Sequence, residues 1–418
     1  MAKLEKWRNN LNLQIYNSDL CGRVRLKMDP KFIYKKVNLL LKRAKELLST
    51  VGFILSSRHL FQVLSFRDRP SVFSIELHAS VSLDVKLHLL SSGIKWNRVS
   101  FSAHSHFFGE PVINPRYLNK STWQFINEDL VKNFTREYQR YLKNQKGFIV
   151  SHSLSLLRLY ERFNGKIFVI NSTRFESPHT LMQEQFESLI ELIKDLKSQD
   201  RMTIVSNNKG DQDYLKHFTG VDSVLLPSYC RYSPPLKRLD SRLLILSRNQ
   251  ELGQVLQRQI PESVTLDSAF HGPYSHEEFM NFSGVILIPY NISTMRLFEI
   301  STSGMPVYIP SDMLLKDWTK YPGVLSELSW VQVLGSPCPE YLKGTPADPK
   351  WPEFYDWWLN RADWKSKLFF PNVATFSTPQ EVYELHRLHM NSFDISNRNQ
   401  QLANSWKSVM ESWVKSLE

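Results

Sequence analysis

The sequence contains no run of apolar residues that is long enough to span a membrane. A transmembrane candidate needs about 18 or more consecutive apolar residues, and none of the 418 positions begins such a run. The sequence also lacks the pattern of a secretory signal peptide, in which a basic segment precedes a short apolar core and a small-residue cleavage site. From these two absences we expect a cytoplasmic protein, either soluble or peripherally associated with a membrane.

Cysteine is scarce as well. The three cysteines, Cys21, Cys230 and Cys338, are far apart, odd in number and without the spacing of a zinc site. We expect reduced thiols in a reducing compartment. His104 and His106 lie two residues apart, but no third ligand accompanies them at a recognisable spacing, so the sequence predicts no metal site.

The sequence has no short internal repeat, no low-complexity tract and no recognisable RNA-binding signature. Its apolar content of 42% and aromatic content of 12% are typical of well-packed globular cores. A chain of 418 residues is long enough for two domains of ordinary size.

Positive charge is concentrated at the start of the chain. The net charge is +11, and the first 60 residues hold 13 Lys and Arg against four Asp and Glu. Residues 31–48 have the pattern of an amphipathic helix with one apolar and one basic face. The basic face either is simply solvated or contacts an anionic membrane surface or a nucleic-acid backbone. We favour a solvated face, consider membrane contact next, and expect no nucleic-acid partner.

Short apolar segments alternate with helical patterns along the rest of the chain. This alternation predicts an α/β protein with two doubly wound, Rossmann-like domains. The expected strands lie at 72–77, 98–102, 148–151, 166–170, 202–206 and 223–226 in a first series, and at 243–246, 264–266, 285–288 and 307–309 in a second.

A proline-rich polar segment at residues 227–238 is the best linker between the two series. We therefore expect four regions. They are a basic helical segment at 1–65, a first Rossmann-like domain at 66–235, a second at 240–375, and terminal helices at 376–418.

Residues 285–311 are the most informative stretch. An apolar run ends at a polar turn, a short helical pattern carries Glu299, and a second apolar run follows Gly304. Ligands bind at the carboxyl ends of strands in open α/β sheets, where a helix N-terminus offers N–H groups to an anion. Ser293 and Thr294 supply hydroxyl donors for a diphosphate, and Glu299 is placed to accept hydrogen bonds from a ribose. The alternative is an ordinary βαβ unit with a solvated Glu299.

This stretch resembles the nucleotide-sugar half-site of GT-B glycosyltransferases, with a likeness that covers residues 240–320. In that family a Glu early in a helix, followed by Gly-x-Pro, holds the donor ribose. Many retaining members carry an acidic residue eight positions before that Glu, where this chain has Asn291. Two segments, PYNISTMRLFE and WLNRADW…FFPNVATF, also resemble uncharacterised glycosyltransferase-like proteins of large algal viruses and algae.

The resemblance implies a GT-B architecture in which an interdomain cleft separates an acceptor domain from a donor domain and the last helices pack back on the first domain. It implies metal-independent transfer from a UDP- or GDP-linked sugar, which serves as co-substrate without a further cofactor, to a glycan or glycoprotein. Two alternatives stay open: a protein that binds nucleic acid or an anionic membrane, and an inactive relative that binds sugar nucleotides.

Three further residues are candidates for donor binding. Arg248 follows the 243–246 strand, and its planar guanidinium suits phosphate oxygens, although a surface arginine is an equal alternative. Tyr274 is a candidate to flank the nucleobase, with a packing role favoured instead. Tyr290, in the turn before Ser293, completes the donor-binding set.

The catalytic base is the least determined part. His104 and Glu176, each beyond a strand of the first series, compete for this role. His78 and His152 end neighbouring strands in the same way, and the sequence does not rank them. For each histidine, the alternative is a side chain that satisfies loop backbone.

Overall fold

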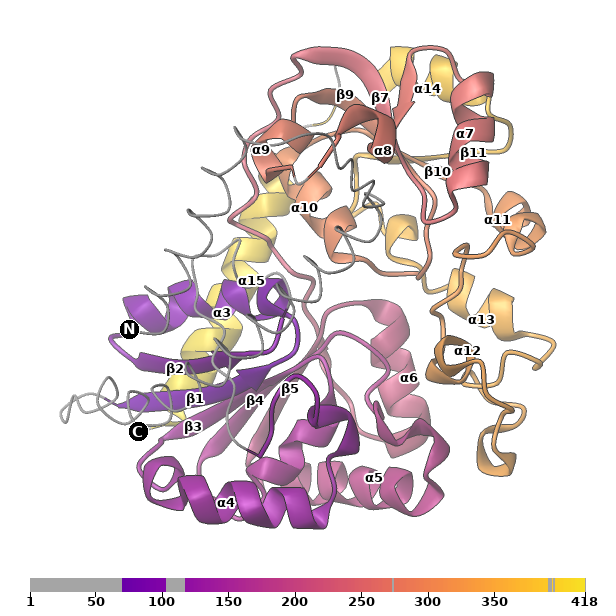
Figure 1. Cartoon of the computed structure of the whole chain (residues 1–418). Helices are drawn as coiled ribbons and strands as arrows, with labels where there is room; N and C mark the ends of the chain where they lie inside the picture. The colour runs from indigo at the N-terminus through magenta and orange to yellow at the C-terminus, as the bar shows by residue number, and fades with distance from the viewer. Residues whose placement is uncertain (1–69, 103–116, 273, 390–392, 394, 418) are drawn as a thin grey trace, which may run out of the picture. The chain divides into compact units, whose positions relative to one another are not determined.

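The computed structural model describes residues 70–102, 117–272, 274–389, 393 and 395–417, and in this part of the chain the strands form two parallel sheets (Figure 1). The first sheet has six strands, β1 (Ser71–Glu76), β2 (Lys95–Ser100), β3 (Gly147–Ser151), β4 (Lys166–Asn171), β5 (Met202–Ser206) and β6 (Val224–Leu225). The second has five, β7 (Asp240–Leu246), β8 (Ser263–Thr265), β9 (Phe282–Leu287), β10 (Val307–Pro310) and β11 (Val373–Phe376).

All ten expected strands are present, and the α/β class with two Rossmann-like parallel sheets is confirmed. The additional strand, β11, was not predicted. It has four residues, and a long segment without other strands separates it from β10. Its register against β10, from Val307 opposite Val373 to Pro310 opposite Phe376, extends the second sheet at its edge.

The two sheets share one strand order. The first runs β2-β1-β3-β4-β5-β6 and the second β11-β10-β9-β7-β8. In each, the first strand of the series lies between the second and the third, so the direction of winding reverses there. These reversals, between β1 and β3 and between β7 and β9, are topological switch points, where open α/β sheets bind ligands.

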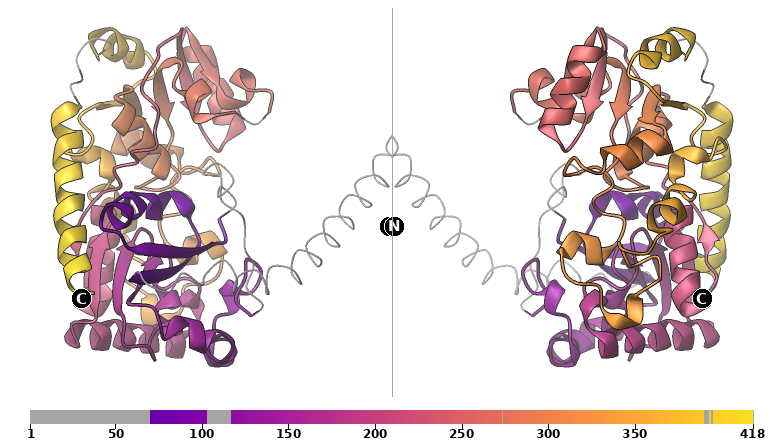
Figure 2. Two further views of the ribbon diagram at one scale, coloured as in Figure 1. Left: turned by 90° about the vertical axis from the view of Figure 1, so that its left-hand side faces the viewer. Right: turned by 90° about the vertical axis from the view of Figure 1, so that its right-hand side faces the viewer.

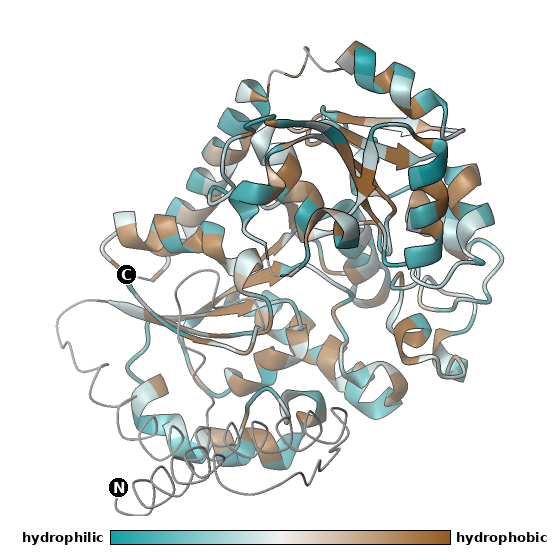
Figure 3. Cartoon of the chain, turned by 45° about the horizontal axis from the view of Figure 1, so that its top comes forward, coloured by the Kyte–Doolittle hydropathy of each residue, from teal (hydrophilic) through white to brown (hydrophobic). Residues whose placement is uncertain are grey.

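Helices connect the strands and cover the sheets: α3 (Ala79–Ser91), α4 (Glu128–Leu142), α5 (Gln183–Ser198), α6 (Lys209–Thr219), α7 (Gln250–Gln259), α8 (Leu266–Ala269), α9 (His276–Phe279), α10 (Met295–Ser303), α11 (Asp312–Trp318), α12 (Trp330–Leu334), α13 (Phe354–Leu359), α14 (Glu381–His389) and α15 (Ser396–Lys415). Side-chain caps fix several starts, because Asn127, Asn208 and Asn249 each accept a hydrogen bond from a first-turn N–H. The strands are largely hydrophobic and the helices are two-sided (Figure 3).

The long terminal helix α15 packs on the first sheet (Figure 2). Its Trp413 ring lies 5.3 Å from the ring of Phe168 on β4, and Trp406 Nε1 donates to the carbonyl of Pro227 at 2.9 Å. A Cβ at Gly147 would lie 2.9 Å from the carbonyl oxygen of Lys166 and 3.1 Å from Trp413, so only glycine fits beneath the helix. The preceding helix, α14, contacts β11 of the second sheet instead.

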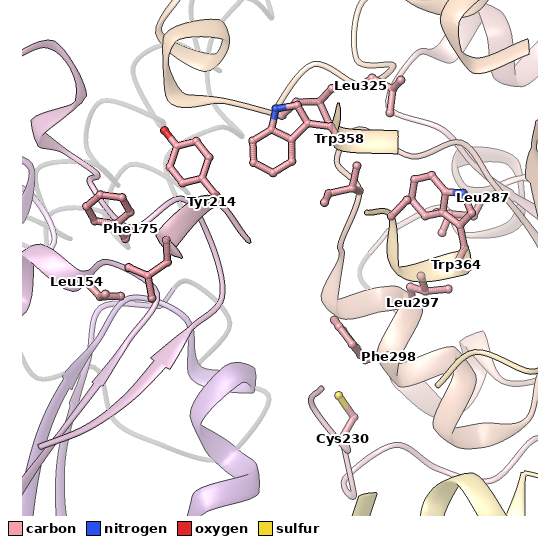
Figure 4. Close-up of a cluster of buried hydrophobic side chains, with 14 of the residues drawn as sticks. Leu154, Phe175, Tyr214, Cys230, Leu287, Leu297, Phe298, Leu325, Trp358 and Trp364 are labelled. Atoms are coloured by element: carbon pink, nitrogen blue, oxygen red, sulfur yellow. The ribbon is translucent and has the colours of Figure 1, made fainter. Parts of the chain in front are cut away.

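The segment between β10 and β11 reaches back to the first sheet. Trp358 stacks on Tyr214 of α6 with ring centroids 5.5 Å apart (Figure 4), and Tyr341 Oη donates to the carbonyl of Thr180 at 2.6 Å. Buried aromatic pairs of this kind add stability beyond their area alone. Both halves of the described chain thus share one apolar core.

Among the described residues, no helix combines the length and apolarity that crossing a membrane requires. The basic segment at residues 31–48, with its predicted membrane contact, lies outside the described residues.

Candidate functional site

Two histidines lie at the switch point of the first sheet. His78 lies two residues after the end of β1 and occupies the N-cap position of α3, and His152 directly follows β3. Their ring centroids are 6.1 Å apart, and His78 Nδ1 lies 2.7 Å from the Ser80 hydroxyl. His152 has a φ of 71°, a left-handed conformation that is costly for a residue with a Cβ.

The electrostatic surroundings keep His152 neutral. Burial, with the nearby His78 and Arg174 acting in the same direction, lowers the pKa of its imidazole to about 3. A neutral imidazole offers one N–H donor and one nitrogen acceptor. The sequence placed both histidines at strand ends, and the strand order brings them together.

Glu76 is the last residue of β1 and has no exposure to solvent. Its carboxylate pairs with Arg98 of β2 at 3.2 Å and accepts a hydrogen bond from Ser82. Burial raises the pKa of Glu76 to about 7, and Arg98 opposes the rise. This pair links two neighbouring strands and is closed off from solvent.

Glu176 lies in the loop after β4, and its carboxylate points into the protein. It is fully buried, Tyr214 Oη donates to its Oε1 at 2.9 Å, and no described residue makes a hydrogen bond to its Oε2. Burial raises the pKa of Glu176 to about 7, against the lowering effect of the Tyr214 hydrogen bond and Arg174. To act as base, Glu176 must first be uncovered, so that role stays a prediction. His104 lies outside the described residues.

Arg174, from the same loop, connects residues that follow strands of both sheets. Its guanidinium donates to Asn291 Oδ1 at 3.3 Å and to the carbonyl of Glu327 at 2.9 Å, and lies 3.6 Å from Asp211 Oδ1. It is 3% exposed, with the rings of Trp330 and Trp358 within 6 Å. In the sequence, the only signal for Arg174 is its place in a polar turn after a predicted strand.

Arg248 and Tyr290 lie at the switch point of the second sheet. Arg248 follows β7 and Tyr290 follows β9, and the guanidinium carbon lies 3.2 Å from the ring centroid. Glu327 forms an ion pair with the same guanidinium. The Arg248 side chain is still 46% exposed, so it remains accessible to a ligand.

The turn after β9 leads into α10. Thr294 caps this helix, since its hydroxyl oxygen accepts a hydrogen bond from Leu297 N at 3.3 Å. Ser293 makes a hydrogen bond with the buried Asp363, whose pKa is raised well above its usual range by burial. The Thr294 hydroxyl therefore caps α10, and the Ser293 hydroxyl is held by the carboxyl group of Asp363.

Glu299 lies one turn into α10 and is not solvated. Tyr232 Oη donates to its Oε1 at 2.8 Å, and Arg296 lies 3.0 Å from its Oε2. The side chain is 7% exposed. The alternative of a solvated helix residue is therefore wrong for Glu299. Tyr232, which belongs to the linker between the sheets, was not recognised from the sequence.

Tyr274 packs against other aromatic rings. Its ring stacks on Phe270 with centroids 4.4 Å apart and lies 6.2 Å from Phe279. These contacts match the packing role favoured for it.

One Asp-x-Asp triplet is present, at Asp211 and Asp213 on α6. Residues two apart on a helix do not face each other. Asp211 is buried beside Arg174, whereas Asp213 forms ion pairs with Lys209 at 2.5 Å and Arg361 at 2.8 Å. Among the described residues no three His, Cys, Asp or Glu side chains gather as a metal site would require.

No protein-family model matches this chain, and no curated protein matches it. One solved structure, an S. aureus MnaA–UDP co-structure, is similar at a TM-score of 0.42 with 10% sequence identity, over 82% of this chain and 95% of that one.

The unusual environment of Glu176 predicts a pH-dependent stability. Its pKa is about 7 in the folded protein against 4.5 ordinarily. Between these values the folded state keeps a proton that the unfolded state has lost, so the unfolding free energy falls as pH rises. Glu176→Gln lacks this proton equilibrium. Its stability relative to the wild type should therefore increase between about pH 5 and pH 8, by up to roughly 3 kcal/mol.

Urea unfolding of both proteins at the two pH values measures this difference. Glu76 titrates in the same range in both proteins, so it cancels. The exposed Glu187→Gln serves as control and should show no such trend. A stability difference for Glu176→Gln that is independent of pH contradicts the buried, protonated carboxyl group.

Proposed function

We propose that this protein is a GT-B glycosyltransferase that moves a sugar from a UDP- or GDP-linked donor to a hydroxyl group of a glycan or glycoprotein without a metal ion. One observation carries the proposal. The two parallel sheets share one strand order, and polar side chains lie at both switch points. Arg248 lies at the switch point of the second sheet, and His78 and His152 lie at that of the first. In this scheme residues 66–235 bind the acceptor, residues 240–375 bind the donor, and residues 376–418 complete the protein.

Arg248 and the start of α10 hold the donor diphosphate in this proposal. Arg248 is partly exposed, and Glu327 and the ring of Tyr290 orient its guanidinium. A planar guanidinium matches two phosphate oxygens at once, and helix N-terminal N–H groups favour an anion. The Thr294 hydroxyl accepts from the helix backbone, which leaves its own O–H as a donor to phosphate.

Glu299 holds the donor ribose. An ionised carboxylate has about four acceptor positions, and Tyr232 and Arg296 occupy one on each oxygen. Two positions are then left for the two ribose hydroxyls. Because both partners fix the carboxylate before the donor binds, little side-chain entropy is lost on binding. Ser293 and Tyr274 complete the donor site in the proposal, Ser293 beside the diphosphate and Tyr274 at its edge.

A base from the first sheet activates the acceptor hydroxyl. Asn291 stands where many retaining enzymes of this fold carry an acid, and it accepts a hydrogen bond from Arg174. An inverting displacement, which needs one base, fits this arrangement. Of the described candidates we place His78 in this role, because it lies at the switch point whereas Glu176 is enclosed by the protein.

Nucleotide binding is the first test of the donor site. In a thermal-shift assay with EDTA, one of UDP, GDP, CMP and dTDP, or its sugar conjugate, should stabilise the protein. The expected gain is about 2.7 kcal/mol at a hundredfold excess over the dissociation constant. Arg248→Ala and Glu299→Gln should each abolish most of the shift.

Arg242→Ala is the matched control. Arg242 lies on β7, the strand that ends shortly before Arg248, and it pairs with Asp240. This variant should retain the full shift. If no nucleotide stabilises the wild type, or if both site variants keep the shift, the donor site is misplaced.

Turnover distinguishes His78 from Glu176 as the catalytic base. With the donor sugar identified by the binding assay, nucleotide release from it should fall at least about a hundredfold in His78→Gln, the usual contribution of a general base. Nucleotide affinity should stay unchanged. Glu176→Gln should retain most of the rate, and the reverse pattern assigns the base to Glu176.

A further inference from the structure

A pocket of about 330 Å³ lies between α3, α15 and the linker that joins the two sheets. None of its lining residues belongs to the candidate site. They come from the end of α3, from the linker and from one face of α15: His88, Ser91, Ser92, Arg231, Gln400, Ala403, Asn404, Lys407, Met410 and Glu411.

The lining is polar and carries more positive than negative charge. Arg231 and Lys407 are its two permanent cations, and Glu411 is its one carboxylate. The Lys407–Glu411 distance is 3.9 Å, at the outer limit of an ion pair, so Lys407 is weakly engaged. Burial lowers the pKa of His88, with Arg231 the next contribution, and both disfavour a positive charge on its imidazole.

A buried carboxylate holds the backbone next to Arg231. Asp84, on α3 and 3% exposed, accepts hydrogen bonds from the backbone N–H groups of Tyr229 at 2.7 Å and Cys230 at 3.3 Å. The Arg231 guanidinium carbon lies 5.3 Å from the centroid of the Tyr229 ring. The linker is thereby fixed to α3 at the point where it presents Arg231 to the pocket.

We propose that this pocket binds a small phosphate monoester, such as a sugar phosphate. Arg231 and Lys407 bind the phosphate from two sides, the guanidinium through paired N–H groups and the ammonium as a point charge. Gln400, Asn404 and the Ser91 hydroxyl match the hydroxyl groups of the remainder. A volume of 330 Å³ exceeds what phosphate alone fills and lies within the range of small-molecule sites.

Binding of ³²P-labelled inorganic phosphate and of glucose 6-phosphate to the full chain, measured by equilibrium dialysis, tests the proposal. All proteins carry Arg248→Ala, so that the donor arginine does not contribute. Arg231→Ala with Lys407→Ala should weaken both ligands about tenfold or more. Glu411→Gln should strengthen both, because it removes the opposing carboxylate. Lys415→Ala, an exposed lysine on the same helix outside the pocket, is the control and should leave both affinities unchanged.

The opposite signs expected for the two pocket variants separate a binding effect from misfolding, since a misfolded protein gains no affinity. Saturable binding that responds in both directions, tighter for glucose 6-phosphate than for phosphate, supports the site. The proposal is overturned if the parent protein binds neither ligand, or if the double variant binds both as well as the parent does. Because the donor arginine is absent throughout, the result is independent of the proposed function.

Discussion

The buried guanidinium of Arg174 is the constraint on which the arrangement of the site depends. A charge removed from water is tolerated only when partners replace its hydration. Here those partners are Asp211 of the first half and Asn291 and the Glu327 carbonyl of the second. Since Glu327 also pairs with Arg248, the same contacts fix the loop after β4, the turn after β9 and the residue whose carboxylate pairs with Arg248. The hydrogen bonds and the ion pair of this one side chain therefore connect the polar residues that follow strands of both sheets.

The shared strand order explains why so few residues make a site. Each sheet reverses its winding once, and the segments that leave the two strands at that point diverge to opposite faces. Open α/β sheets bind ligands at this point, so side chains that follow these strands by one to three residues are placed to contact a ligand. His78 and His152 occupy this position in one sheet, as Arg248 and Tyr290 do in the other. The chemistry assigned to each edge follows from these residue types and not from the fold, which supports many functions.

The sequence predicted those features that depend on local pattern. Apolar runs bounded by turn residues identified ten strands, and a short helical pattern between a polar turn and Gly304 identified α10. Contacts between distant segments were not predictable. Nothing near Tyr232 indicates that its hydroxyl reaches Glu299, 67 positions later, and nothing near Trp358 indicates that it stacks on Tyr214. Such contacts depend on how whole helices and strands pack together, and the pattern of residues along a single sequence does not show that packing.

The most direct test of the central claim is a crystal structure of the protein with the nucleotide that stabilises it. The diphosphate should lie at the carboxyl ends of β7 and β9, in contact with Arg248 and the start of α10, with the ribose hydroxyls on Glu299. The His78 side chain should face the sugar of the donor. Nucleotide bound instead in the pocket beside Arg231 and Lys407, with the β7–β9 edge empty, would contradict the assignment of the donor site.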